Sequence, residues 1–127
     1  MARRFPLNHE LHLANVKAAH ELGVRIGVGT DIPIEARNRY PESYYTELDL
    51  LTEAGLSNRD VLDSATRVGA EILRMADTLG TLQKGMLADV LVIGSDPFED
   101  LHNLRDVRLV IADGRIVRNS DRLPEER

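Results

Sequence analysis

The sequence of 127 residues contains no cysteine. This absence excludes disulfide bonds, thiolate nucleophiles and cysteine-based metal sites, so any metal ligand must be His, Asp or Glu. Aromatic residues are also scarce, because they make up 4% of the chain and tryptophan is absent. The core must therefore be built from Leu, Val, Ile and Ala, and a hydrophobic content of 43% is ordinary for a globular protein.

The sequence also lacks a long apolar run and a block of like charge. No stretch approaches the roughly 20 apolar residues of a membrane span, and no apolar run follows the basic N-terminal residues, as it would in a secretory signal. The net charge of -5 argues against nucleic acid as a main partner. We therefore expect a cytoplasmic protein that binds neither membranes nor nucleic acid.

Apolar residues at helical spacing predict three helices. Asn8 can cap the first helix, because its side-chain oxygen can accept a hydrogen bond from a free amide in the first turn. Ser57 opens the third helix, and Asp60 three residues later makes a capping box with Asp in place of Glu. The expected helices cover residues 9–22, 42–54 and 57–74.

Strand patterns divide the chain into two parts. Residues 24–28 alternate as a strand does, and Gly27 and Gly29 leave one face bare for the close approach of another backbone or a ligand. Further strands are expected at residues 88–93, 106–112 and 115–117, with Asp113 and Gly114 forming a tight hairpin turn. We expect an α/β part over residues 1–76 and a β part over residues 77–127. One central strand cannot close a sheet and a short meander has open edges, so each part looks like a slice of a larger fold.

Several local patterns in one order resemble the C-terminal segment of the metal-dependent amidohydrolase superfamily. The run Gly23–Asp31 looks like the eighth strand of its barrel. The chain is most similar to the imidazolonepropionase-like and prolidase-like branch. The other matching segments are Glu47–Leu56 and Ser57–Arg74 as the following helices, Leu79–Ile93 as the return into a small β-sandwich, and Val107–Val117 as its final hairpin.

This resemblance implies an α/β fold made of the last one to two β/α units of a (β/α)8 (TIM) barrel, followed by part of a β-sandwich and incomplete as a lone chain. It implies a divalent metal, zinc first, at the C-terminal ends of the strands. Asp31 is at that position and is the catalytic candidate, as metal ligand or as acceptor of a proton from metal-bound water. The loop that follows would border the substrate pocket through Arg37, Asn38, Arg39 and Tyr40.

The same resemblance implies ligands that this chain lacks. The family has a His-x-His pair and further His residues on other strands, and often a carboxylated Lys or a Glu, whereas this chain has only His9, His12, His20 and His102, none in that motif. A catalytic zinc usually needs three protein ligands. We therefore expect no tight metal binding and no hydrolysis of amide, lactam or imide-like C–N bonds by the chain alone. Its expected partners are the missing N-terminal barrel segment or another copy of itself, and a small-molecule substrate in the completed enzyme.

Other interpretations are open at this point. Asp31 can instead be a strand-end residue that bonds the following loop, and that loop can simply be solvated. His9 and His12, three residues apart, can share a helix face and a metal ion, or can be a solvated helix start. The chain as a whole can be a non-catalytic binding or assembly module that oligomerises through open strand edges, or a compact domain in which the β segments pair with residues 24–28.

Overall fold

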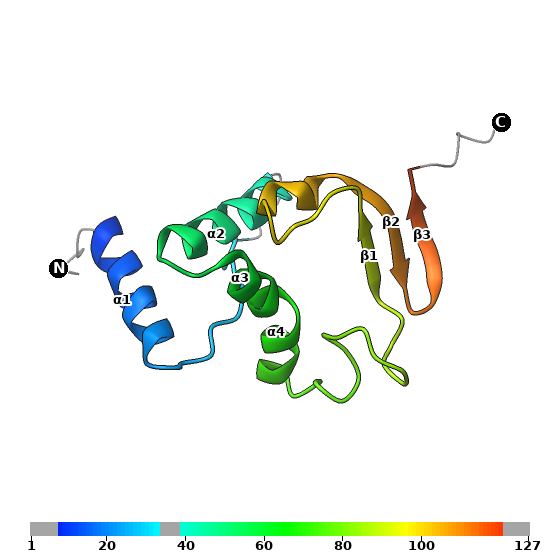
Figure 1. Ribbon diagram of the computed structural model, residues 1–127, viewed down its shortest axis with the longest axis horizontal. Helices are drawn as coiled ribbons and strands as arrows, with labels where there is room; N and C mark the ends of the chain where they lie inside the picture. The colour runs from blue at the N-terminus through cyan, green and yellow to red at the C-terminus, as the bar shows by residue number, and fades with distance from the viewer. Residues whose placement is uncertain (1–7, 34–38, 121–127) are drawn as a thin grey trace.

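The computed structural model describes residues 8–33 and 39–120. In these residues the helices lie at one end and an antiparallel sheet at the other (Figure 1). None of the helices in the described residues has the length and apolar character needed to cross a membrane. The elements are α1 (His9–Glu21), α2 (Glu42–Glu53), α3 (Asn58–Ala65), α4 (Arg67–Ile72), β1 (Val90–Ile93), the 3-10 helix η2 (Leu101–Arg105), β2 (Val107–Ala112) and β3 (Arg115–Asn119).

The first two helices agree with the sequence patterns to within a residue at each end. The Asn8 side chain accepts a hydrogen bond from the amide of Leu11 at 3.2 Å, so it caps α1 as predicted. No residue of α1 is fully buried, and Leu13 and Val16 provide its packing against the core. The helix is therefore attached to the rest of the molecule along a narrow apolar stripe.

The prediction of one helix over residues 57–74 was wrong, because the chain breaks at Thr66 into α3 and α4. The Thr66 hydroxyl donates to the carbonyl of Leu62 at 2.6 Å, and its amide bonds the carbonyl of Asp63. Such back-bonding by a threonine side chain competes with the helical backbone pattern. The loop at Gly80 then packs into the break, since a Cβ on Gly80 would lie 2.6 Å from Ala70 Cβ and 3.2 Å from the Thr66 carbonyl oxygen.

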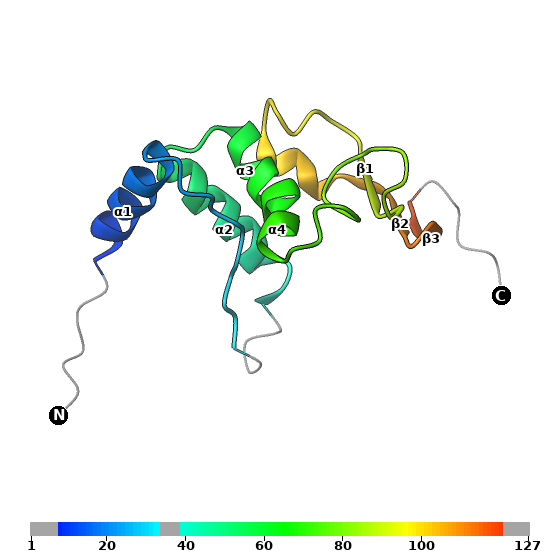
Figure 2. The same ribbon diagram turned by 90° about the horizontal axis from the view of Figure 1, so that it is seen from below.

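The segment predicted as a strand at residues 24–28 is irregular in the structure, and this prediction was also wrong. A strand requires a neighbouring strand, and in the described residues none lies beside this segment. Two of its amides bond helices instead: the amide of Val24 donates to the carbonyl of Ala19 at 3.0 Å, and the amide of Val28 donates to the carbonyl of Ser64 at 3.2 Å. Figure 2 shows the segment as a plain tube between the end of α1 and the loop before α2.

The three-stranded sheet has the order β1-β2-β3, and both pairs are antiparallel. The predicted hairpin is confirmed, because Asp113 and Gly114 have φ angles of 49° and 73° between the paired residues Ala112 and Arg115. The Asp89 carboxylate accepts from the amide of Asp113 at 2.7 Å, so Asp89 fastens this turn. None of the sheet's strands pairs with residues 24–28, which excludes the compact domain built on that pairing within the described residues.

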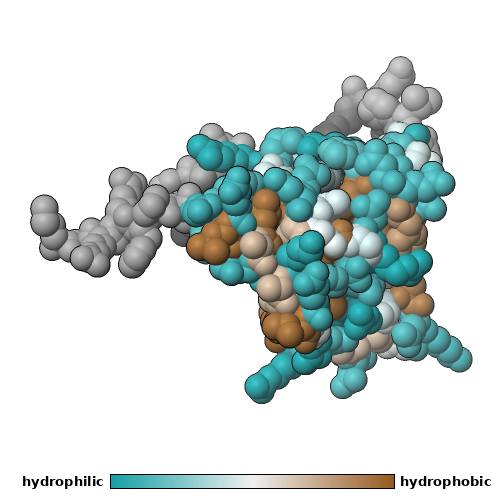
Figure 3. Space-filling model, turned by 60° about the vertical axis from the view of Figure 1, so that its left-hand side comes forward, coloured by the Kyte–Doolittle hydropathy of each residue, from teal (hydrophilic) through white to brown (hydrophobic). Residues whose placement is uncertain are grey.

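The core is small and lies among the helices. It contains Leu48, Leu51, Ala54, Leu56, Val61 and Leu101. Leu101 is 6% exposed and comes from η2, so the chain returns from the sheet to the helices before it forms β2. In contrast, fourteen large apolar side chains in the described residues are at least 41% exposed. Apolar residues gather in several brown patches between hydrophilic ones on the face shown in Figure 3.

Candidate functional site

Asp31 lies at the end of the glycine-rich segment, where the chain turns into the loop before α2. Its φ angle of 44° is in the left-handed region, which Asp tolerates better than most residues. The residue is exposed. The turn therefore presents a carboxylate to solvent at the end of a segment in which Ile26 and Val28 pack against the core.

The loop after Asp31 is fastened at its far end. The Thr30 hydroxyl and the Tyr40 hydroxyl lie 3.1 Å apart, within hydrogen-bond distance. Arg39 and Tyr40 are both exposed beside this contact, whereas Arg37 and Asn38 lie outside the described residues. The structure thus brings two of the four predicted loop residues to the same end of the segment as Asp31.

A hollow of about 500 Å³ opens beside Thr30. Leu50 supplies an apolar surface in it, and Arg39, Glu42 and Glu47 supply charges of both signs. Arg105 donates two hydrogen bonds to the Glu42 carboxylate, at 2.8 and 3.0 Å, and so holds the pKa of Glu42 below its usual value. The hollow is lined by Thr30, Arg39, Glu42, Ser43, Thr46, Glu47 and Leu50.

The described residues do not fit a catalytic metal centre. Within residues 8–33 and 39–120, no three His, Asp or Glu side chains lie close enough together to hold a metal ion. Three histidines instead contact carboxylates: His9 contacts Glu53 at 3.3 Å, His20 contacts Asp60 at 3.8 Å, and His102 contacts Asp100 and Asp49 at 3.0 and 3.7 Å. Asp31 is therefore a single candidate ligand.

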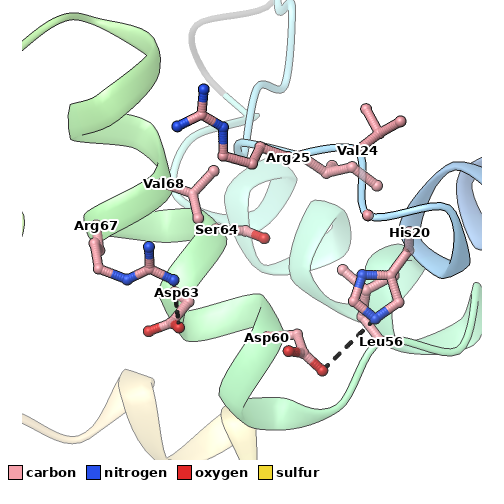
Figure 4. Close-up of a pocket in the computed structure, with 11 residues that line it drawn as sticks. His20, Val24, Arg25, Leu56, Asp60, Asp63, Ser64, Arg67 and Val68 are labelled. Carbon is pink, nitrogen blue, oxygen red and sulfur yellow. Dashed lines mark hydrogen bonds and ion pairs between the residues drawn. The ribbon is translucent and has the colours of Figure 1, made fainter.

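A second hollow, of about 210 Å³, lies at the opposite end of the segment from Asp31. Figure 4 shows His20, Arg25, Asp60, Asp63 and Arg67 around it, with His20 directed at Asp60 and Arg67 directed at Asp63. Arg25 pairs with Glu71, Arg67 pairs with Asp63, and His20 Nε2 lies 3.8 Å from Asp60 Oδ2. Because these polar side chains contact partners on the protein, we interpret this hollow as a polar seam between α1, the segment and the α3–α4 pair.

The lowered pKa values in this region have structural causes. Hydrogen bonds from Arg25 and Arg67 lower the pKa of Glu71. The hydrogen bond from the Ser57 hydroxyl lowers the pKa of Asp60. Arg25 and Glu71 were not singled out from the sequence, although Asp63, Arg67 and Glu71 recur at the four-residue spacing of helical ion pairs.

Comparisons with known proteins identify the family to which the chain belongs. The model of the amidohydrolase family matches residues 7–117. A solved amidohydrolase structure is 36% identical, with a TM-score of 0.79, over 90% of this chain and 27% of that chain. The crystal structure of a putative prolidase from Bifidobacterium longum is 38% identical, with a TM-score of 0.75, over 87% of this chain and 28% of that chain.

A curated relative gives the same result at the level of sequence. The 5-methylthioadenosine/S-adenosylhomocysteine deaminase of Halothermothrix orenii is 32% identical over a match of 117 positions, and the match covers 75% of this chain and 26% of the relative. The chain thus spans about a quarter of the length of the curated relatives that it matches. With a family model that covers all the described helices and nearly the whole sheet, the chain belongs to the amidohydrolase family.

Proposed function

We propose that these residues form the C-terminal part of a metal-dependent hydrolase that cleaves C–N bonds in small amide, lactam or imide-like substrates. In this proposal the helices and residues 24–31 are the last β/α units of a (β/α)8 barrel, and the sheet is part of a β-sandwich. The single observation that carries it is the family match over residues 7–117, on a chain with about a quarter of its relatives' length. A relative named as a deaminase and a solved structure named as a putative prolidase support a C–N bond as the bond that is cleaved.

We assign to Asp31 the acceptance of a proton from the attacking water. An exposed carboxylate such as that of Asp31 can do this when it lies within hydrogen-bond distance of that water. The remaining groups of the site would come from barrel segments that are not among these 127 residues, on the same or another polypeptide. A divalent metal, with zinc first, is part of the proposal only for that completed site, in which Asp31 would be one ligand among several.

The test compares the chain alone with the completed enzyme. The purified chain, given zinc or manganese, is expected to leave N-acyl amino acids and lactams unhydrolysed. Addition of a polypeptide that supplies the other barrel strands, including a His-x-His pair, is expected to produce turnover. Asp31→Asn in this chain should then lower kcat by about a hundredfold or more, as loss of a general base does.

A matched control uses Asp77→Asn, because Asp77 is an exposed carboxylate in a turn outside the proposed site. This variant should retain the turnover of the unchanged chain after complementation. Metal-dependent hydrolysis by the chain alone would overturn the expected inactivity. Full activity of the Asp31→Asn variant in the complemented enzyme would overturn the role of Asp31.

A second candidate function is a non-catalytic assembly module, in which the chain pairs with another copy. The observation that favours it is the sheet, where β1 and β3 each pair with β2 alone in the described residues. Such unpaired edges are templates for pairing with another strand. Under this alternative the chain oligomerises, and addition of the other barrel segments produces no turnover. The hydrolase proposal instead predicts turnover on that addition.

A further inference from the structure

The segment that leads to Asp31 touches the α3–α4 pair at three successive points. The Arg25 guanidinium donates to a Glu71 carboxylate oxygen at 2.9 Å. Two residues on, Gly27 lies so close to α4 that a Cβ there would be 2.8 Å from Ile72 Cδ1. The amide of Val28 then donates to the carbonyl of Ser64 at 3.2 Å.

The break at Thr66 makes the last of these contacts. In an uninterrupted α-helix the carbonyl of Ser64 would accept from the amide four residues later. At the break it accepts from Val28 instead. Ser64 is 4% exposed, so this carbonyl lies in a place where an unpaired polar group would be costly. The hydrogen bond from the Val28 amide therefore supplies a partner for the Ser64 carbonyl at the break.

The contact between Arg25 and Glu71 is reinforced by a second arginine, Arg67, which also binds the Glu71 carboxylate. Arg67 donates to the other carboxylate oxygen of Glu71 at 2.7 Å and to Asp63 at 2.9 Å. The Glu71 side chain is 22% exposed, and it is held between two guanidinium groups. Asp63 lies in α3 and Glu71 in α4, so this chain of ion pairs links the two helices to each other and to Arg25.

The middle contact is steric and depends on the absence of a side chain. Around the Cβ position of Gly27, the backbone atoms Gly69 Cα and Ser64 O both lie at 3.9 Å, behind the nearer methyl of Ile72. The exposed Ile72 side chain can rotate away from a single added carbon, but the two backbone atoms cannot move away from a branched side chain. Gly29 differs, since its Cβ position has no atom within 4 Å.

We propose that the broken α3–α4 pair is a positioning device for Asp31, which holds the approaching segment at Gly27 and Val28 and makes Gly27 a positioning residue. The restraint stands on these contacts alone, while its value for catalysis rests on the proposed function. It replaces, in this chain, the neighbouring strands that would otherwise align such a segment.

The experiment compares Gly27→Val with Gly29→Val in the 127-residue chain, using amide hydrogen exchange measured by NMR. In the Gly27→Val variant the amide of Val28 should exchange about five- to tenfold faster, as expected for loss of one backbone hydrogen bond. The HN–Hα coupling of Asp31 should change as well, because its left-handed backbone is no longer fixed. Both values should stay unchanged in the Gly29→Val variant, while the core amides of Leu51 and Val61 report global stability in each.

Two further variants keep the test decisive if Gly27→Val does not fold. Gly27→Ala should give a small effect, because the Ile72 methyl can rotate away, and Glu71→Gln should speed exchange at Val28, whose amide bonds the Ser64 carbonyl, by releasing Arg25. Equal exchange at Val28 in the Gly27 and Gly29 variants, or a rise shared equally by the core amides, would overturn the proposal.

A kinetic measurement separates this proposal from the proposed function. In the complemented hydrolase, Gly27→Val should lower kcat and leave KM unchanged, because it displaces a proton acceptor and removes no substrate contact. If Asp31→Asn leaves turnover intact, the proposed function fails while the exchange result still decides the restraint. If turnover needs Asp31 but kcat is the same in Gly27→Val and Gly29→Val, the positioning role fails and the proposed function stands.

Discussion

Ser57 and Asp60 show how far single residues specify the start of α3. The Ser57 hydroxyl accepts from the amide of Asp60 at 3.2 Å, and the Asp60 carboxylate accepts from the amide and the hydroxyl of Ser57, the amide at 3.2 Å. This reciprocal arrangement was predicted from the four residues Ser57 to Asp60 alone. It could be predicted because both partners are local in the sequence and need no tertiary contact.

Replacing Ser57 with Ala is expected to destabilise the chain. Loss of an N-cap side chain lowers the free energy of unfolding by about 1 kcal/mol, which urea denaturation can measure. Ser95→Ala provides the control, since Ser95 is an exposed turn residue. Equal stability of the two variants would show that the capping box contributes nothing.

The difference between wild type and the Ser57→Ala variant should also depend on pH. The Ser57 hydrogen bond lowers the pKa of Asp60 in the folded chain, so the ionised form stabilises the fold above the unfolded pKa of about 3.9. That contribution is lost as the pH falls through the lower folded pKa. The stability gap should therefore narrow in acid, and a gap that widens below pH 4 would contradict the assignment.

The sequence alone predicted only some of the residues of the candidate site. Asp31 and the bare glycines stand out because a carboxylate follows an alternating apolar run. Arg25 and Glu71 do not, because they meet across 46 residues of sequence and only the folded α4 brings them within 2.9 Å. The sequence therefore indicated the Asp31 carboxylate, whereas the contacts that hold its segment are seen only in the folded chain.

At the scale of elements, local signals predicted α1, α2 and the hairpin, but not the division of residues 57–74 into α3 and α4. The loop at Gly80 packs into the break at Thr66, and no helical pattern in the sequence contains that contact. Residues 24–28 have strand periodicity, but a strand forms only beside another strand. The 3-10 helix η2 was missed altogether, because its importance comes from Leu101 reaching the helical core.

Leu101 is expected to contribute much of the free energy that holds the sheet and the helices together. It is 6% exposed and packs with the core residues of α2 and α3. Leu101→Ala should lower the free energy of unfolding by about 2–5 kcal/mol, as other buried Leu→Ala changes do. Thermal and urea denaturation followed by circular dichroism measure this loss.

Leu82→Ala is the matched control, because Leu82 is 82% exposed. Its effect should be within about 0.5 kcal/mol, as for most surface substitutions. Amide exchange then locates the effect of Leu101→Ala, which should be largest in η2 and in the adjoining residues of α2. Similar losses in the two leucine variants would mean that η2 does not pack on the core in solution.

At the scale of the whole molecule, the sheet presents apolar side chains on both faces. Neighbouring residues of a strand point to opposite faces. Leu91 and Val92 in β1 are 50% and 41% exposed, and Ile116 and Val117 in β3 are 56% and 63% exposed. Within the described residues, both faces of the sheet and its two outer strands thus expose apolar side chains to solvent.

The isolated chain is therefore expected to self-associate. Exposed apolar patches and open edges drive such association. Light scattering should give a mass above the 14.2 kDa of one chain, and sulfate should increase it, because sulfate strengthens apolar burial. Ile116→Lys with Val117→Lys should shift the mass toward 14.2 kDa, whereas Arg118→Lys, which keeps a charge on the same strand, should not.

The same measurement separates the two functional proposals. If the exposed surface belongs to a larger hydrolase, the complementing barrel polypeptide should replace self-association with a one-to-one complex and suppress binding of an apolar dye. If the chain is an assembly module, self-association should persist beside that polypeptide, at unchanged stoichiometry. A stable monomer that binds no dye at any concentration would contradict both, since the apolar side chains on β1 and β3 would then need no partner.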